Sequence, residues 1–94
     1  MKIKAQQLQM IQNILRKHDV KRADLFGSFA RGDAHAKSDF DILFEFKGRK
    51  SLIDQAALKR TLEESLNRRV DLITYGSIYP KLKPYILEHR IALV

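Results

Sequence analysis

The stretch of sequence that decides the fold is Asp39-Phe40-Asp41-Ile42-Leu43-Phe44-Glu45-Phe46. Successive side chains of an extended strand point to opposite faces. The residues on one face are Phe40, Ile42, Phe44 and Phe46, and those on the other are Asp39, Asp41, Leu43 and Glu45. This strict alternation predicts a β-strand over residues 39–46 with its aromatic face in the core.

A second strand is expected just upstream, where the apolar-leaning run Arg22–Phe26 ends at Gly27. A short helical turn over Ser28–Arg31 and a polar loop over Gly32–Ser38 then lead into the strand at 39–46. Because this connection does not look long enough for a full crossover, we expect the two strands to lie in a mixed sheet.

Two amphipathic helices are predicted on either side of these strands in the sequence. The first covers Ile3–His18, and the second runs from a Ser51 N-cap, with Asp54 in a capping-box-like position, to about Asn67. The expected apolar residues are Leu8, Ile11, Ile14 and Leu15 in the first helix, and Leu52, Ile53, Ala56, Leu58, Leu62 and Leu66 in the second.

A third strand is predicted over Arg69–Thr74, and a last helix from residue 80 or 81 to His89. The apolar end Ile91–Val94 is expected to dock on the core or on a partner. This order of elements gives the fold class α/β (α+β), a small three-stranded mixed sheet flanked by helices. With 94 residues, the chain 1–94 is expected to form a single domain.

The composition narrows the kinds of site that the chain can carry. It contains no cysteine, which excludes disulfides and thiolate metal sites and favours hard cations such as Mg²⁺. The net charge of +7 suggests an anionic partner, although a solvated basic surface explains it equally well. Aromatic residues do not interleave regularly with the basic ones, so a base-stacking platform is not indicated and nucleic acid is not the expected partner. Neither a signal peptide nor a membrane span is recognisable, which favours a cytoplasmic location.

Asp39 and Asp41 form the first candidate site. Residues two apart in a strand point to the same side, so the two carboxylates project together, and a divalent cation would relieve their repulsion. Mg²⁺ typically takes one or two carboxylates together with substrate phosphates. The alternative is structural: Asp39 starts the strand and Asp41 faces water.

The segment Gly27-Ser28-Phe29-Ala30-Arg31-Gly32 forms the second candidate site. Gly27 permits close backbone approach at the turn, and backbone N–H groups at a helix start, with the Ser28 hydroxyl, can hold phosphate oxygens. Arg31 can neutralise phosphate or orient the loop. An ordinary strand–turn–helix connection is the alternative, but the Asp-x-Asp pair on the next strand favours a phosphate site.

The two segments together, Gly27–Gly32 and Ser38–Leu43, resemble the signature of the DNA polymerase β-like nucleotidyltransferase superfamily. The short length is similar to its minimal nucleotidyltransferase (MNT) branch. The resemblance implies a nucleotidyltransferase fold and a third carboxylate on a later strand, a position that Asp71 occupies, although Asp71 could also be a solvent-facing charge. The implied catalytic and metal-binding residues are Asp39, Asp41 and Asp71, and the implied nucleotide-binding residues are Gly27, Ser28, Arg31 and Ser38.

The resemblance also implies the reaction and the partner. ATP and Mg²⁺ would be used for in-line displacement at the α-phosphorus, with Asp71 helping to deprotonate the attacking hydroxyl. Stand-alone MNT domains resemble antitoxins of two-gene modules whose toxin is a helical HEPN-domain protein, and some of these antitoxins transfer AMP to a tyrosine of the toxin. The alternatives are an antitoxin that masks its toxin by binding alone, and nucleotidyl transfer to a small molecule or to an RNA end.

Several other polar residues are assigned no catalytic role. The histidines show no ligand spacing, and only His35 lies in the loop near the candidate site. Asp24 is expected to be exposed, Asp33 to be a turn residue, and the tyrosines to serve packing. These remaining histidines and tyrosines are His18, His89, Tyr75, Tyr79 and Tyr85.

Overall fold

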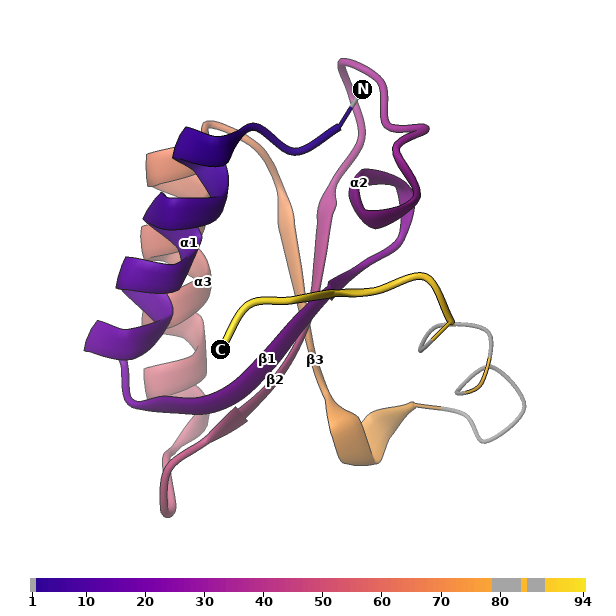
Figure 1. The fold of residues 1–94 in the computed structure, drawn as a ribbon. Helices are drawn as coiled ribbons and strands as arrows, with labels where there is room; N and C mark the ends of the chain where they lie inside the picture. Colours follow the sequence, from indigo (N-terminus) through magenta and orange to yellow (C-terminus); the bar gives the residue numbers. More distant parts are fainter. Residues whose placement is uncertain (1, 79–83, 85–87) are drawn as a thin grey trace.

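The computed structural model describes residues 2–78, 84 and 88–94 (Figure 1). The helices and strands are α1 (Ala5–Lys17), β1 (Val20–Phe26), α2 (Ser28–Arg31), β2 (Phe40–Phe46), α3 (Leu52–Leu66), β3 (Val70–Thr74), the 3-10 turn η1 (Tyr75–Ser77) and β4 (Ile91–Ala92). The predicted last helix, from residue 80 or 81 to His89, falls mostly outside the described residues, as do Tyr79 and Tyr85. No helix in the described part of the chain is long and apolar enough to cross a membrane.

The strands form one mixed sheet in the order β3-β2-β1-β4. Strand β1 is antiparallel to both β2 and β4, whereas β2 and β3 run parallel. The mixed sheet is confirmed, but the expected count of three strands is wrong, because Ile91 and Ala92 pair with β1 as a fourth strand. A two-residue strand is too short to show any periodicity in the sequence.

The C-terminal end therefore docks on this chain's own core. Leu93 is only 2% exposed, and its N–H donates to the Ala23 carbonyl at 2.9 Å. Figure 1 shows this end, in yellow, crossing beside β1. The sequence left two docking sites open for this apolar end, the core and a partner, and the structure shows it on the core.

Helices α1 and α3 lie side by side and cover one face of the sheet (Figure 1). The alternation in β2 is confirmed, because Phe40, Ile42 and Phe44 are at most 1% exposed and belong to the core under these helices. Leu43, on the opposite face, is fully buried as well. The other core residues are Ile11, Leu15, Val20, Ala23, Leu25, Phe29, Ala34, Leu58, Leu62, Leu66, Val70 and Leu93.

The start of α3 departs from the expected apolar stripe. Leu58, Leu62 and Leu66 are buried, but Leu52 and Ile53 are 82% and 80% exposed, and Ala56 is also exposed. The buried row has a spacing of four, so its continuation one turn before Leu58 falls on positions 54 and 55 and not on 52 and 53. The predicted cap is confirmed, because Ser51 and Asp54 form a reciprocal capping box.

Candidate active site

The parallel pairing of β2 and β3 places Asp41 directly beside Asp71. Each is the second residue of its strand, and α3 forms the connection that returns the chain to the same edge of the sheet. Because side chains alternate along a strand, Asp41 and Asp71 point away from the face that carries Phe40 and Ile42. Two carboxylates that are distant in sequence thus meet on the face opposite α1 and α3.

The charge around Asp41 is not balanced. Burial raises the pKa of the Asp41 carboxyl from 3.8 to about 6, and the charge of Asp71, a hydrogen bond between these two carboxyl groups and the charge of Asp39 add to this rise. Arg31 acts in the opposite direction but does not cancel it. Such a site favours either a bound proton or a cation.

Gly27 brings the turn after β1 up against the Asp41 carboxylate. Its φ of 74° lies in the region that L residues rarely adopt. A Cβ built on Gly27 would lie 3.1 Å from Cγ of Asp41 and would collide with its Oδ2. Glycine is therefore required here both by the backbone conformation and by the close approach, and phosphates held by this turn would lie next to the carboxylates.

The turn itself is a tightly closed single helical turn. The N–H groups of Ala30 and Arg31 donate to the Gly27 carbonyl at 3.1 and 3.0 Å, and Ser28 is the first residue of α2. The Arg31 side chain forms an ion pair with Asp33, with 3.2 Å between Nε and Oδ2. Arg31 is exposed and its charge still reaches Asp41, so it can act on a phosphate bound between them.

Asp39 and Ser38 belong to the loop that enters β2. Asp39 lies one residue before the strand, which begins at Phe40 and not at residue 39. The Ser38 Oγ accepts a hydrogen bond from the His35 N–H at 2.8 Å, and the Ser38 N–H donates to the His35 carbonyl at 3.0 Å. Ser38 therefore closes this turn, and its hydroxyl hydrogen is still available for a nucleotide.

The three aspartates do not form a closed metal cage. Within the described residues, no three acidic, histidine or cysteine side chains are gathered as a ready metal site. Asp41 and Asp71 are in contact, and Asp39 acts on Asp41 through its charge. This donor set nevertheless fits Mg²⁺, which is usually bound by one or two carboxylates plus substrate phosphates and not by an all-protein cage.

Asp24 corrects an expectation from the sequence. It is 4% exposed, and the Tyr75 hydroxyl donates to its Oδ2 at 2.6 Å. The guanidinium nitrogens of Arg22 and Arg90 lie 4.0 and 3.7 Å from the same oxygen. Burial, followed by the bond to Asp24, raises the pKa of Tyr75. The sequence around Asp24 carries no sign of this arrangement, because Tyr75 and Arg90 come from distant segments.

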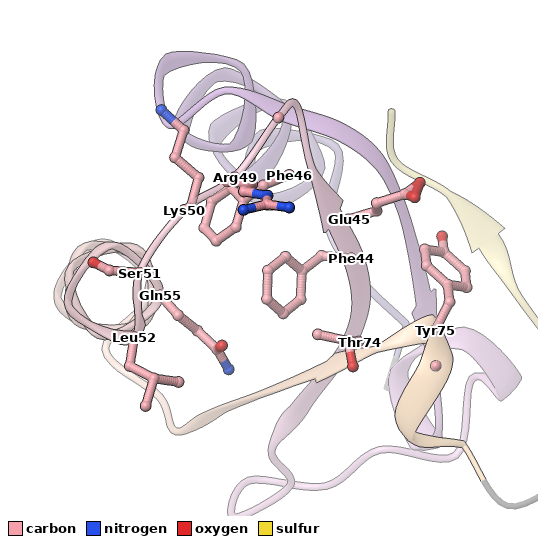
Figure 2. A pocket seen from close by; sticks show the side chains of 12 residues that line it. Phe44, Glu45, Phe46, Arg49, Lys50, Ser51, Leu52, Gln55, Thr74 and Tyr75 are labelled. Carbon is pink, nitrogen blue, oxygen red and sulfur yellow. The ribbon is translucent and has the colours of Figure 1, made fainter.

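The cleft in Figure 2 lies at the other ends of β2 and β3 and has a volume of about 490 Å³. Phe44, Phe46 and Thr74 from the strands face Gln55 and Leu52 from α3 across it (Figure 2). None of the three aspartates lines this cleft. A smaller cleft of about 220 Å³ does lie against Asp39, between the loop at 36–38 and residues 67–69.

Comparison with known proteins agrees with this arrangement. The family model described as a nucleotidyltransferase domain matches residues 8–93. A candidate protein adenylyltransferase of Methanocaldococcus jannaschii is 53% identical over 78 residues, which cover 83% of this chain and 84% of that protein.

Two solved structures share the fold. A candidate minimal nucleotidyltransferase superposes with a TM-score of 0.79 at 34% identity, covering 92% of this chain and 88% of its own. A toxin–antitoxin structure with AMP-PNP superposes with a TM-score of 0.78 at 26% identity, covering 93% of this chain and 72% of its own. The mixed sheet flanked by helices is thus the fold of nucleotidyltransferases.

Proposed function

Because this chain belongs to the nucleotidyltransferase domain family, we propose that it is an Mg²⁺-dependent enzyme that transfers AMP from ATP to a hydroxyl group of a partner protein. The observation that carries the proposal is the pairing of Asp41 with Asp71 beside Gly27. A phosphate turn and an acidic pair meet there, which is the combination that a nucleotide bound with magnesium requires.

Each residue has a specific part in this reaction. The backbone N–H groups after Gly27 and the Ser28 hydroxyl would hold the β- and γ-phosphates, with Arg31 on the outer side. Asp39 and Asp41 would bind the cation, which would neutralise the negative charge of the triphosphate as pyrophosphate leaves. Asp71 would take up the proton of the attacking hydroxyl, since it faces Asp41 from the neighbouring strand.

The proposed acceptor is a tyrosine of a HEPN-domain toxin, and the protein would act as its antitoxin. A relative is named as a candidate protein adenylyltransferase, and a structural neighbour is a toxin–antitoxin structure with an ATP analogue, AMP-PNP. The aspartates support catalysis over masking by binding alone, because masking has no need for a carboxyl whose pKa is raised to about 6 by burial and by two neighbouring carboxylates.

The test is a transfer assay on the pair of proteins. The protein is incubated with Mg²⁺, labelled ATP and the product of the neighbouring gene, and the partner is analysed by mass spectrometry. An AMP adduct on a tyrosine of the partner, lost with Asp41→Asn or on chelation of Mg²⁺, supports the proposal. A tight complex that forms with no adduct, and that survives Asp41→Ala, would establish masking instead.

A further inference from the structure

Arg68 makes an unusual set of contacts from the connection between α3 and β3. Its Nη1 donates to the carbonyl oxygens of Ala36 at 2.7 Å, Ser38 at 3.3 Å and His35 at 3.4 Å. These carbonyls belong to the loop that ends at Asp39. The hydrogen bonds between His35 and Ser38 close that loop on itself, whereas Arg68 ties it to another part of the fold.

The same guanidinium reaches the phosphate turn. The Cζ atom of Arg68 lies 5.3 Å from the centre of the ring of Phe29, the residue that follows Ser28. Phe29 stacks on Phe40 with 4.0 Å between the ring centres and 9° between the planes. Phe40 stands between Asp39 and Asp41, and its N–H donates to the carbonyl of Arg69 at 3.0 Å. Arg68 therefore connects the turn, the loop and the start of β2.

We infer that Arg68 is a positioning residue that fixes Asp39 relative to Asp41 and to the Gly27–Ser28 turn; this inference rests on the proposed function. Ala34 is buried and anchors the start of the loop, and Arg68 anchors its end. The charges of Asp39 and Asp41 repel each other, and the loop that carries Asp39 is held against this repulsion by its hydrogen bonds to Arg68. A planar guanidinium can donate to several carbonyls and stack on a ring at once, which an ammonium group cannot.

The chain offers a matched control in Arg69. It carries the same charge, its side chain is exposed, and it lines the same small cleft beside Asp39. Arg68→Gln and Arg69→Gln therefore remove one charge from the same place, but only the first removes the contacts to the loop. Arg68→Lys keeps the charge and the apolar stem. It is measured in parallel, so that the inference can still be tested if Arg68→Gln does not fold.

Two measurements on the free protein test the inference without an acceptor. Hydrogen–deuterium exchange reports the amides of residues 35–40, and a Mn²⁺ titration followed by electron paramagnetic resonance reports cation affinity. Arg68→Gln is expected to speed exchange in this loop and to weaken Mn²⁺ binding by about 10- to 100-fold, as loss of a residue that orients a metal ligand does. Arg68→Lys is expected to fall between Arg68→Gln and the wild-type protein, and Arg69→Gln to leave both quantities close to wild type.

The transfer assay separates positioning from simple destabilisation. If Asp39 is displaced, a higher Mg²⁺ concentration is needed for half-maximal transfer. If only the folded fraction is smaller, the rate falls and that Mg²⁺ concentration does not change. The KM for ATP is expected to change less than this Mg²⁺ concentration, because the Gly27–Ser28 turn is held by β1 as well as by the contact between Arg68 and Phe29.

The outcomes are separable. Unchanged loop exchange and cation affinity in Arg68→Gln and Arg68→Lys, or equal losses in Arg69→Gln, would overturn the inference even where the wild-type protein transfers AMP. Absence of transfer by the wild-type protein would count against the proposed function, while the measurements on the free protein still decide the role of Arg68.

Discussion

Asp24 and Asp41 lie on the same face of the sheet and have opposite surroundings. Asp24 is 4% exposed, and its neighbours are the donors Tyr75, Arg22 and Arg90. Asp41 is partly buried, and two of its neighbours are the carboxylates of Asp71 and Asp39. A buried carboxylate surrounded by donors has its hydrogen-bond partners within the fold, whereas one beside other carboxylates is stabilised by a proton or a cation from outside. The comparison separates a structural aspartate from a candidate catalytic one.

The largest expected effect distinguishes the two aspartates by activity. Asp41→Asn preserves the shape of the side chain and removes a charged ligand. Loss of a residue that only orients a ligand already costs about 10- to 100-fold, so we expect AMP transfer to fall by at least about 100-fold. The measurement is the initial rate of adduct formation on the partner, with circular dichroism to confirm that the variant is folded. A wild-type rate in this variant would remove Asp41 from the mechanism.

The second prediction concerns the close approach of Gly27 to Asp41. Gly27→Ala is expected to destabilise the fold by about 2–4 kcal/mol, from backbone strain plus displacement of the carboxylate, and to reduce transfer. Gly48 is the comparison for a positive φ without a collision, since its φ is 66° and a Cβ there meets no atom within 4 Å. Gly48→Ala is therefore expected to cost about 1 kcal/mol in urea unfolding, whereas Gly27 combines its φ of 74° with a ψ of −154°, a region that is essentially confined to glycine. Equal losses in the two variants would mean that contact with Asp41 does not matter.

The third prediction addresses Asp24. Asp24→Ala leaves the Tyr75 hydroxyl without its acceptor and is expected to lower the free energy of unfolding by about 1–3 kcal/mol. Asp24→Asn keeps an acceptor oxygen and is expected to lose less. Transfer per folded molecule is expected to change little in both variants, as measured by rates normalised to the folded fraction. If transfer instead fell as steeply as in Asp41→Asn, the division between the two aspartates would be lost.

The sequence predicted features that depend on local patterns. The alternation from Phe40 to Phe44, the helix start at Ser51 and the mixed sheet all rest on nearby residues, and the structure confirms them. The aspartate pair was expected because Asp-x-Asp lies beside a Gly-Ser turn. The third carboxylate, Asp71, was expected from family resemblance alone, because the parallel register that brings it beside Asp41 is not visible in the sequence.

What the sequence missed depends on contacts between distant segments. Asp24 was expected at the surface, but Tyr75 and Arg90 surround it from the far end of the chain. Strand β4 has only two residues and gains its place by pairing with β1. Leu52 and Ile53 carry the right residue type for a buried stripe, but the wrong angle around α3 relative to Leu58. In each case the burial or pairing of the residue depends on contacts with distant segments, which local sequence propensity does not predict.

The smallest expected effect is the pH dependence of stability. The pKa of Asp41 is raised from 3.8 to about 6 in the fold, so ionising it opposes folding. Stability is therefore expected to fall as pH rises from about 4 to about 6 and to stay lower above that range. The full shift would correspond to about 3 kcal/mol, but Asp41 is only partly buried, so solvent screening reduces the expected loss to about 1 kcal/mol.

Two comparisons isolate the contribution of Asp41 in unfolding curves measured between pH 4 and pH 7.5. Asp41→Asn cannot ionise, so it is expected to lack this loss and to be more stable than the wild-type protein above about pH 6. Mg²⁺ favours the ionised form, so adding it is expected to stabilise the wild-type protein in the same range and to have little effect on Asp41→Asn. A wild-type protein that gains stability between pH 4 and 6 relative to Asp41→Asn would reverse the sign, and would show that Asp41, like Asp24, is already satisfied within the fold.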